Sequence, residues 1–140
     1  MRWIKGKTKM VWLPRTASVT FTKGDLVMLS SGALATATIS SENHIGIILK
    51  DITSGDSDFA TSAVKVPVEV PLSPACEFEA TVTGTLVTTS LGTTYDLSSA
   101  SVVNQGGTTT GQVTCVGYIS ATKGRFILNS FTGVRDSAGL

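Results

Sequence analysis

The chain has 140 residues, about the length of one domain with its own hydrophobic core, which leaves little room for a second full-sized domain. Only 15% of the residues are charged, 41% are hydrophobic and the formal net charge is +1, so the composition excludes the highly charged, weakly apolar type of disordered chain. Threonine, serine, valine and glycine are abundant, and these residues favour strands and turns over long amphipathic helices.

The first 23 residues form a basic segment that contains both tryptophans, Trp3 and Trp12. The segment has six cations and no carboxylate, whereas the rest of the chain is net acidic. The cations are Arg2, Lys5, Lys7, Lys9, Arg15 and Lys23. Because helical periodicity is lacking, we expect residues 1–18 to form an extended arm that lies on a surface or a partner. Charge balance favours an acidic protein as that partner over nucleic acid, whose phosphates the acidic body would repel.

The start of the chain lacks the pattern of a secretory signal. Its apolar run, residues 10–13, ends at Pro14 and is too short for a signal-peptide core. No run reaches the length of about 20 apolar residues that crosses a bilayer, so we expect no membrane contact. Synthesis in the cytoplasm would keep Cys76 and Cys115 reduced, and two cysteines are too few for a disulfide framework.

After the basic segment, short apolar stretches alternate with glycine, serine and aspartate. Residues 19–29 resemble a hairpin, residues 45–49 a buried strand and residues 51–58 a polar loop. These stretches are too short and too frequently interrupted for helices. They predict a β-rich body.

Residues 64–72 alternate strictly between two faces. Val66, Val68 and Val70 share one face, and the other face contains Pro67 and Pro71. Proline cannot donate a hydrogen bond to a neighbouring strand, so we expect an edge strand that is able to join the sheet of a neighbour.

Similar patterns predict further strands at residues 76–83, 111–119 and 125–128. The expected fold class is therefore all-β, with an extended N-terminal arm and one small β-barrel or β-sandwich domain over residues 19–131. Residues 132–140 are expected to form a flexible C-terminal tail.

Two segments share the pattern G-x-L-V-x-x-S-x-G, residues 24–32 and residues 84–92. Each is followed by an apolar-Gly-apolar stretch, at residues 45–47 and 116–118. The pattern indicates either two related halves or a coincidence in a sequence rich in serine, threonine and glycine, and both readings remain open.

Residue types that carry chemistry are sparse. His44 is the only histidine and has no close ligand pair with either cysteine, so we expect a polar loop histidine, buried structural thiols and no metal site. Asp56 and Ser57 lack the surroundings of a serine nucleophile and predict a plain turn.

Glu77 and Glu79 share one face of a predicted strand at a spacing of roughly 7 Å, which would suit paired-carboxylate hydrolysis. Alternating glutamates are also common on exposed strand faces, and no phosphate-binding glycine loop accompanies them. We therefore expect neither an enzyme nor a cofactor.

Several segments resemble tailed-bacteriophage head decoration proteins, also called cement or minor capsid proteins. The resemblance covers roughly residues 11–130 as a series of short stretches: VWLPRTASV at 11–19, KGDLV at 23–27, IGIIL at 45–49, VPVEVP at 66–71 and GYISATKGRF at 117–126. Members are typically small β-rich proteins, often trimers, that bind the outside of the head and lock neighbouring capsomers together. The resemblance implies that the chain binds the major capsid protein on the virion exterior.

Low charge also favours assembly, because a sparsely charged surface gives weak protection against association. Buried aromatic residues tend to dominate such contacts. The residues expected to contact the capsid or other subunits are Trp3, Lys5, Lys7, Lys9, Trp12, Leu13, Pro14, Arg15, Val66, Val68 and Val70. Two alternatives stay open: another phage component, such as a capsid-associated, head-closure, fibre or tail protein, and a carbohydrate-binding β-module.

Overall fold

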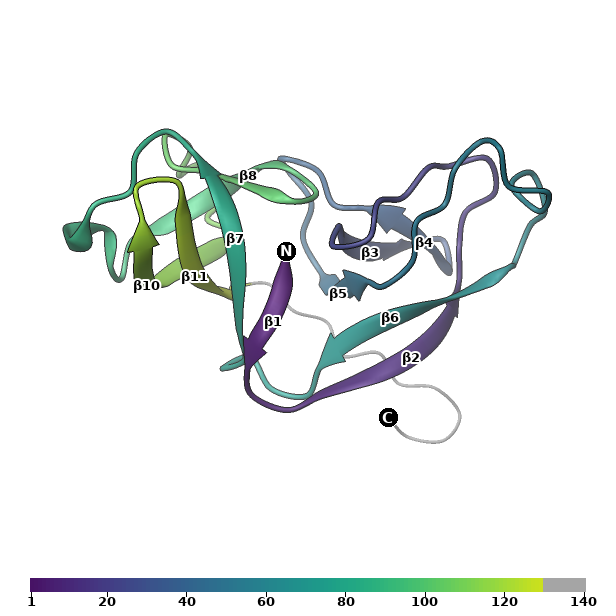
Figure 1. Ribbon diagram of the computed structural model, residues 1–140, viewed down its shortest axis with the longest axis horizontal. Helices are drawn as coiled ribbons and strands as arrows, with labels where there is room; N and C mark the ends of the chain where they lie inside the picture. The colour runs from purple at the N-terminus through teal and green to yellow at the C-terminus, as the bar shows by residue number, and fades with distance from the viewer. Residues whose placement is uncertain (130–140) are drawn as a thin grey trace.

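The computed structural model describes residues 1–129 and shows eleven strands and a single turn of 3₁₀ helix within them (Figure 1). The all-β prediction is confirmed. No helix in the described part of the chain is long and apolar enough to cross a membrane. The predicted domain end at residue 131 and the predicted tail over 132–140 lie outside the described residues.

The N-terminal lobe, residues 8–71, is a five-stranded antiparallel sheet with the order β2-β6-β5-β3-β4. Its strands are β2 (Thr8–Pro14), β3 (Leu26–Ser30), β4 (Ala33–Thr36), β5 (His44–Ile48) and β6 (Lys65–Pro71). A parallel bridge between Arg15 and Leu34 connects the end of β2 to β4. The first strand of the lobe therefore meets the last strand of the sheet.

The C-terminal lobe, residues 77–128, is a closed barrel with the order β7-β11-β10-β8-β9, and β9 pairs in parallel with β7. Its elements are β7 (Glu77–Thr83), η1 (Thr88–Ser90), β8 (Thr94–Ser99), β9 (Val102–Asn104), β10 (Val113–Ser120) and β11 (Lys123–Leu128). The first strand of the chain, β1 (Arg2–Lys5), joins this lobe by pairing with β7 (Figure 1).

The two lobes have the same strand order when β2 to β6 are matched with β7 to β11 in sequence. The two ends of each sheet also meet in the same way. Arg15 pairs in parallel with Leu34 in the N-terminal lobe, and Val82 pairs in parallel with Val103 in the C-terminal lobe. Arg15 N–H donates to the carbonyl oxygen of Val64, and Val82 N–H donates to that of Thr122, both at 2.9 Å. Arg15 and Val82 are thus equivalent positions.

A second pair of equivalent hydrogen bonds shows which residues of the two lobes correspond. Gly24 N–H donates to the carbonyl oxygen of Ile48 at 2.9 Å, and Gly92 N–H donates to that of Cys115 at 2.8 Å. Both glycines have positive φ, 98° and 81°, a backbone conformation that favours glycine. The halves are therefore related in fold, but residues 24–32 correspond to residues 92–100, not to residues 84–92 as the shared sequence pattern indicated.

The lobes fill their equivalent interiors differently. Val11 and Val68 face each other in the N-terminal lobe, where the C-terminal lobe pairs Phe78 with Phe126. The rings of those two phenylalanines lie 6.0 Å apart between centroids. The matched central pair is therefore aliphatic in the N-terminal lobe and aromatic in the C-terminal lobe.

Apolar side chains from both lobes meet at the junction. Leu26 and Ile47 come from the N-terminal lobe but belong to the core cluster of the C-terminal lobe. Trp3 packs edge-to-face on Phe78 at 5.5 Å between centroids, and its indole N–H donates to the carbonyl oxygen of Glu69 at 3.0 Å. Trp3 thereby connects the two lobes.

A buried polar network adds to the junction. The Gln112 amide donates to the carbonyl oxygens of Thr38 and Ser41, and its Oε1 accepts from Leu97 N–H at 2.8 Å. Ser41 Oγ lies 3.0 Å from His44 Nε2. His44 opens β5 and is fully buried, so the prediction of a polar loop histidine is wrong. Its partner Ser41 belongs to the same lobe, and Gln112 of the other lobe donates to Ser41.

Three other predictions are corrected by the strand pairing. Residues 1–18 are extended but do not form a separate arm, because β1 and β2 are strands of the two lobes. Residues 19–29 do not form a hairpin; β3 instead turns back into β4 at residues 31–32. The predicted edge strand is β6, which lies between β2 and β5. Pro67 stands at the end of the β5–β6 ladder, where its carbonyl oxygen accepts a hydrogen bond from Leu49 N–H and its missing N–H breaks no ladder pair.

Candidate interaction surfaces

The structure separates the predicted contact residues into an exposed group and a buried group. Lys5, Lys7, Lys9 and Trp12 are exposed, and Trp3 and Pro14 are partly buried. The side chains buried within the chain are Leu13, Arg15, Val66, Val68 and Val70. These five line the interior of the N-terminal lobe, so they present no surface to a partner in this fold.

Half of the basic residues near the N-terminus meet acidic groups of the same chain. Arg2 pairs with Glu79 at 3.3 Å, and Lys5 pairs with Glu77 at 3.2 Å. Arg15 approaches the Asp58 carboxylate at 3.5 Å. Half of the positive charge of the basic segment is therefore used to attach β1 to β7 and to hold a loop.

Arg15 is a buried connector rather than a surface cation. Its guanidinium donates to the carbonyl oxygens of Phe59 at 3.0 Å and Asp58 at 2.6 Å. Both belong to the long loop between β5 and β6, whose apolar residue Phe59 packs against the core of the lobe. Nε of Arg15 is buried without a hydrogen-bond partner. Arg15 thus fastens the loop to the end of β2.

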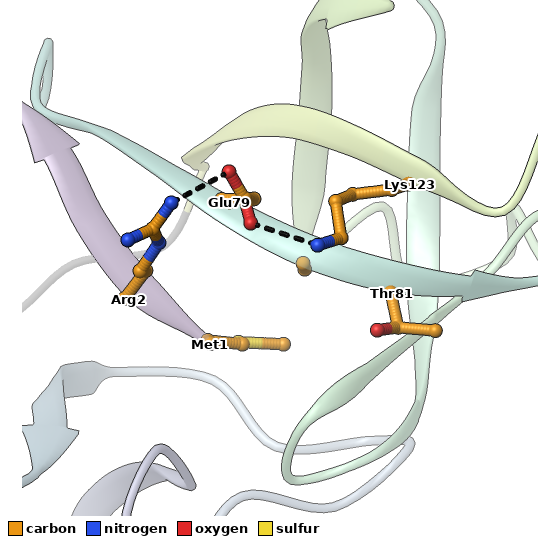
Figure 2. Close-up of a pocket in the computed structure, with 6 residues that line it drawn as sticks. Met1, Arg2, Glu79, Thr81 and Lys123 are labelled. Carbon is orange, nitrogen blue, oxygen red and sulfur yellow. Dashed lines mark hydrogen bonds and ion pairs between the residues drawn. The ribbon is translucent and has the colours of Figure 1, made fainter. Parts of the chain in front are cut away.

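An open pocket of about 210 Å³ lies beside β1 and β7 (Figure 2). Arg2 and Lys123 approach Glu79 from opposite sides, and hydrogen bonds from Lys123 and Arg2 hold the pKa of Glu79 below its ordinary value of 4.5. The terminal amine of Met1 donates to the carbonyl oxygen of Gly24 at 2.8 Å, and burial lowers its pKa. Since these cationic groups already have partners within the chain, the pocket is a poor site for an anionic ligand.

The residues considered for catalysis have structural partners. Glu77 lies beside Lys5 and Arg125, as Glu79 lies beside Arg2 and Lys123, so the two carboxylates form a charge network along β7. Asp56 accepts a hydrogen bond from Thr53 N–H in a turn. Residues 1–129 contain no group of three or more His, Cys, Asp or Glu side chains placed to hold a metal ion.

The two thiols are buried apart from each other. Cys115 lies in the core of the C-terminal lobe, and burial raises the pKa of its thiol above the ordinary value of 9.0. Cys76 donates to the carbonyl oxygen of Lys7 at 3.3 Å. Both thiols are buried, and a buried thiol has little access to a reactant, so both cysteines serve packing.

One exposed apolar surface lies on β2. Met10 and Trp12 are each 54% exposed and project from the same face of the strand, opposite Glu69 and Pro67 of β6. We call Met10 and Trp12 the β2 strip. Sequence reasoning selected Trp12 but missed Met10, although their spacing of two residues in an extended segment places both on one face.

A second set of exposed apolar side chains belongs to the segments around η1 and the β10–β11 turn of the C-terminal lobe. The residues of this η1 surface are Val87, Leu91, Tyr118 and Ile119. The chain comes together here because Leu86 N–H donates to the carbonyl oxygen of Ala121 and Gly92 N–H to that of Cys115. No local pattern marks this surface, since its two halves are about 30 residues apart in the sequence and meet only in the barrel.

Comparisons with known proteins yield no match to any family model, any curated protein or any solved structure.

Proposed function

We propose that this protein is a structural component of a tailed-phage particle that binds the outer surface of the capsid and stabilises it by holding neighbouring capsomers together. The single observation that carries the proposal is the presence of exposed apolar side chains at two separate places, the β2 strip on one lobe and the η1 surface on the other. The resemblance of its short segments to head decoration proteins supports the same function.

Two adhesive surfaces on one chain suit a protein that bridges neighbours. Each contact is small, and a lone contact of this size would bind weakly. On a repeating lattice, however, the first contact places the second at an effective concentration in the mM range, so the combined affinity exceeds that of either contact. Preferential binding to the assembled shell then stabilises it against disassembly without any chemical turnover.

The η1 surface is the part assigned to the major capsid protein. It combines aliphatic side chains with Tyr118, whose hydroxyl and ring suit a partly wet protein contact. Glu77 and Glu79 of β7 form ion pairs with β1 of the same chain, so these carboxylates are not part of the η1 surface.

The test measures occupancy on purified phage heads that lack the protein. The variant Leu91→Ser alters the η1 surface, and Leu72→Ser, at a residue of similar exposure just after β6, is the matched control; the exposures are 52% and 50%. We expect the wild-type chain and Leu72→Ser to saturate the heads, and Leu91→Ser to bind with an affinity lower by about tenfold. Failure of the wild-type chain to bind heads would remove the proposal, and equal binding of both variants would move the contact away from η1.

A further inference from the structure

β2 has one uncovered edge. Its only ladder partner in residues 1–129 is β6, so the opposite side of the strand is unpaired. The uncovered stretch ends where Arg15 bridges to Leu34 and Thr16 N–H donates to the carbonyl oxygen of Leu34, and at its other end it begins with the first residue of β2. The edge therefore consists of Thr8–Pro14, the whole length of β2.

Backbone groups of alternate residues point to this edge. Arg15 N–H donates to Val64 on the β6 side, whereas Thr16 N–H donates to Leu34 on the opposite side. Because the direction alternates along an extended strand, the N–H and C=O groups of Met10 and Trp12 point away from β6. An exposed row of such groups is a template for another strand.

The equivalent edge of the other lobe is occupied. Val11 faces Val68 as Phe78 faces Phe126, so Val11 and Phe78 are matched positions. At Phe78 the edge of β7 is covered by antiparallel β1, with Trp3 as the direct partner. The covered edge of β7 therefore shows that an antiparallel strand fits this position of the fold.

The side chains at the two edges require different partners. Glu77 and Glu79 of β7 receive Lys5 and Arg2 of β1. The residues of β2 at the matched positions are Met10 and Trp12, which are apolar and exposed. A basic strand like β1 would find no carboxylate on β2 itself, and the carboxylate of Glu69, opposite Met10 on β6, already accepts a hydrogen bond from the Thr8 hydroxyl at 2.7 Å. The strand that fits β2 has large apolar side chains two residues apart.

We infer that β2 pairs with β2 of a second copy of this chain, antiparallel about a two-fold axis at Val11. Val11 is the central residue of the edge, so this register uses all of Thr8–Pro14. It places Met10 directly opposite Trp12 of the second copy, both with backbone groups facing across the gap. The apolar strand that the edge requires is thus present in the chain itself, and the inference does not depend on capsid binding.

The register also avoids repulsion. Within the ladder Lys9 faces Leu13 of the second copy, so no like charges lie directly opposite each other there. Just outside it Lys7 faces Arg15, whose guanidinium is buried and bonded to the Asp58 and Phe59 carbonyl groups of its own chain. Thr8 faces Pro14, where Thr8 N–H can donate to the Pro14 carbonyl oxygen but the Thr8 carbonyl oxygen meets no N–H, so the ladder ends at this pair. A two-fold pair is a closed dimer, whereas the family resemblance leads to a trimer, so the molecular mass in solution distinguishes the two assemblies.

The first test is the mass of the purified chain, without heads, over a concentration series in sedimentation. We expect a dimer whose dissociation constant rises about 30-fold in Trp12→Lys, because the change removes an aromatic anchor and places a charge on the edge. Met10→Pro removes only an N–H that points away from β6, so the lobe keeps its ladder while pairing is lost. Leu91→Lys, on the η1 surface, is the matched control and should leave the dimer unchanged.

The second test determines the register of the β2–β2 pairing by disulfide formation between introduced cysteines. Facing residues of a hydrogen-bonded pair have Cα atoms about 5.5 Å apart, within the range that a disulfide spans. A mixture of Met10→Cys chains with Trp12→Cys chains should therefore form a disulfide-linked dimer faster than either variant alone. Thermal unfolding and circular dichroism of each variant establish that the chain is folded.

A wild-type chain that stays monomeric, or that forms a trimer, would overturn the inference. So would a dimer that folded Trp12→Lys and Met10→Pro leave intact, or cross-linking that is no faster in the mixture. Head binding by a monomeric chain would leave the proposed function in place while rejecting the β2 pairing.

Discussion

At matched positions near the ends of their first strands, the N-terminal lobe buries Arg15 and the C-terminal lobe buries Val82. The arginine holds the carbonyl groups of a long loop, whereas the valine fills an apolar barrel. At this matched position the same strand order is thus stabilised by buried hydrogen bonds in one lobe and by apolar packing in the other. The two lobes share a strand order although different interactions stabilise its matched positions.

The outer edges of those first strands differ as well. β7 is covered by β1 through ion pairs, and β2 is left open with an apolar strip. An edge covered inside the chain contributes to stability, and an edge left open is available for association. The comparison therefore assigns stability to β1–β7 and interaction to β2.

Removal of residues 1–15 should have the largest effect on the two lobes. The deletion takes away β1 and all of β2, and with them Val11 and Leu13 from the N-terminal core. We expect no cooperative thermal transition from the truncated chain. Deleting only residues 1–7 spares β2 and should leave a folded chain of lower stability. A folded 16–140 chain would show that β2 is dispensable.

Substitutions of Arg15 and Val82 should have the next largest effect on the free energy of unfolding. Arg15→Ala leaves buried carbonyl groups without donors and opens a cavity, so we expect the free energy of unfolding to fall by about 3–5 kcal/mol. Val82→Ala removes only apolar packing, and about 2 kcal/mol should be lost. Chemical denaturation measures both. Equal losses would mean that the two lobes are stabilised alike.

A smaller effect is expected at Gly46, where β5 approaches β6 closely. An added Cβ would collide with the carbonyl oxygen of Glu69 and touch Val68 at 3.0 Å. Gly46→Ala should therefore cost about 1–3 kcal/mol of unfolding free energy. Gly55→Ala is the control, because its Cβ would meet only Thr53 at an ordinary 3.8 Å. Stability of Gly46→Ala close to that of Gly55→Ala would contradict the close contact.

The smallest expected effect is the pH dependence of the β1–β7 attachment. Hydrogen bonds from Lys123 and Arg2 lower the pKa of Glu79, so its contribution to stability is complete above the ordinary value of 4.5 and is lost as pH falls through the lowered pKa. Between neutral pH and about pH 3, the Tm of wild-type should approach that of Glu79→Gln. Glu42→Gln, an exposed change in the loop before β5, should track wild-type throughout. A constant gap between wild-type and Glu79→Gln would exclude this role.

Local patterns in the sequence were sufficient for part of the fold. Residues 45–49 correspond closely to β5, and residues 76–83 to β7, because alternation of side chains is a property of a few consecutive residues. No alternation marks β8, because this strand buries three consecutive residues, Tyr95, Asp96 and Leu97. β9 is too short, at three residues, to show an alternating pattern. The repeat was visible as a pattern but at the wrong alignment.

By itself, then, the sequence determined that this chain forms strands, that its charges are segregated and that it is poor in reactive side chains. Only the tertiary structure decided that the basic segment pairs with acidic residues of its own chain, that Arg15 is buried, and that Met10 and Trp12 stand on an open edge. The reason is physical: alternation is encoded locally, whereas burial and edge position depend on which distant strands pair, and most contacts in this fold join residues far apart in the sequence.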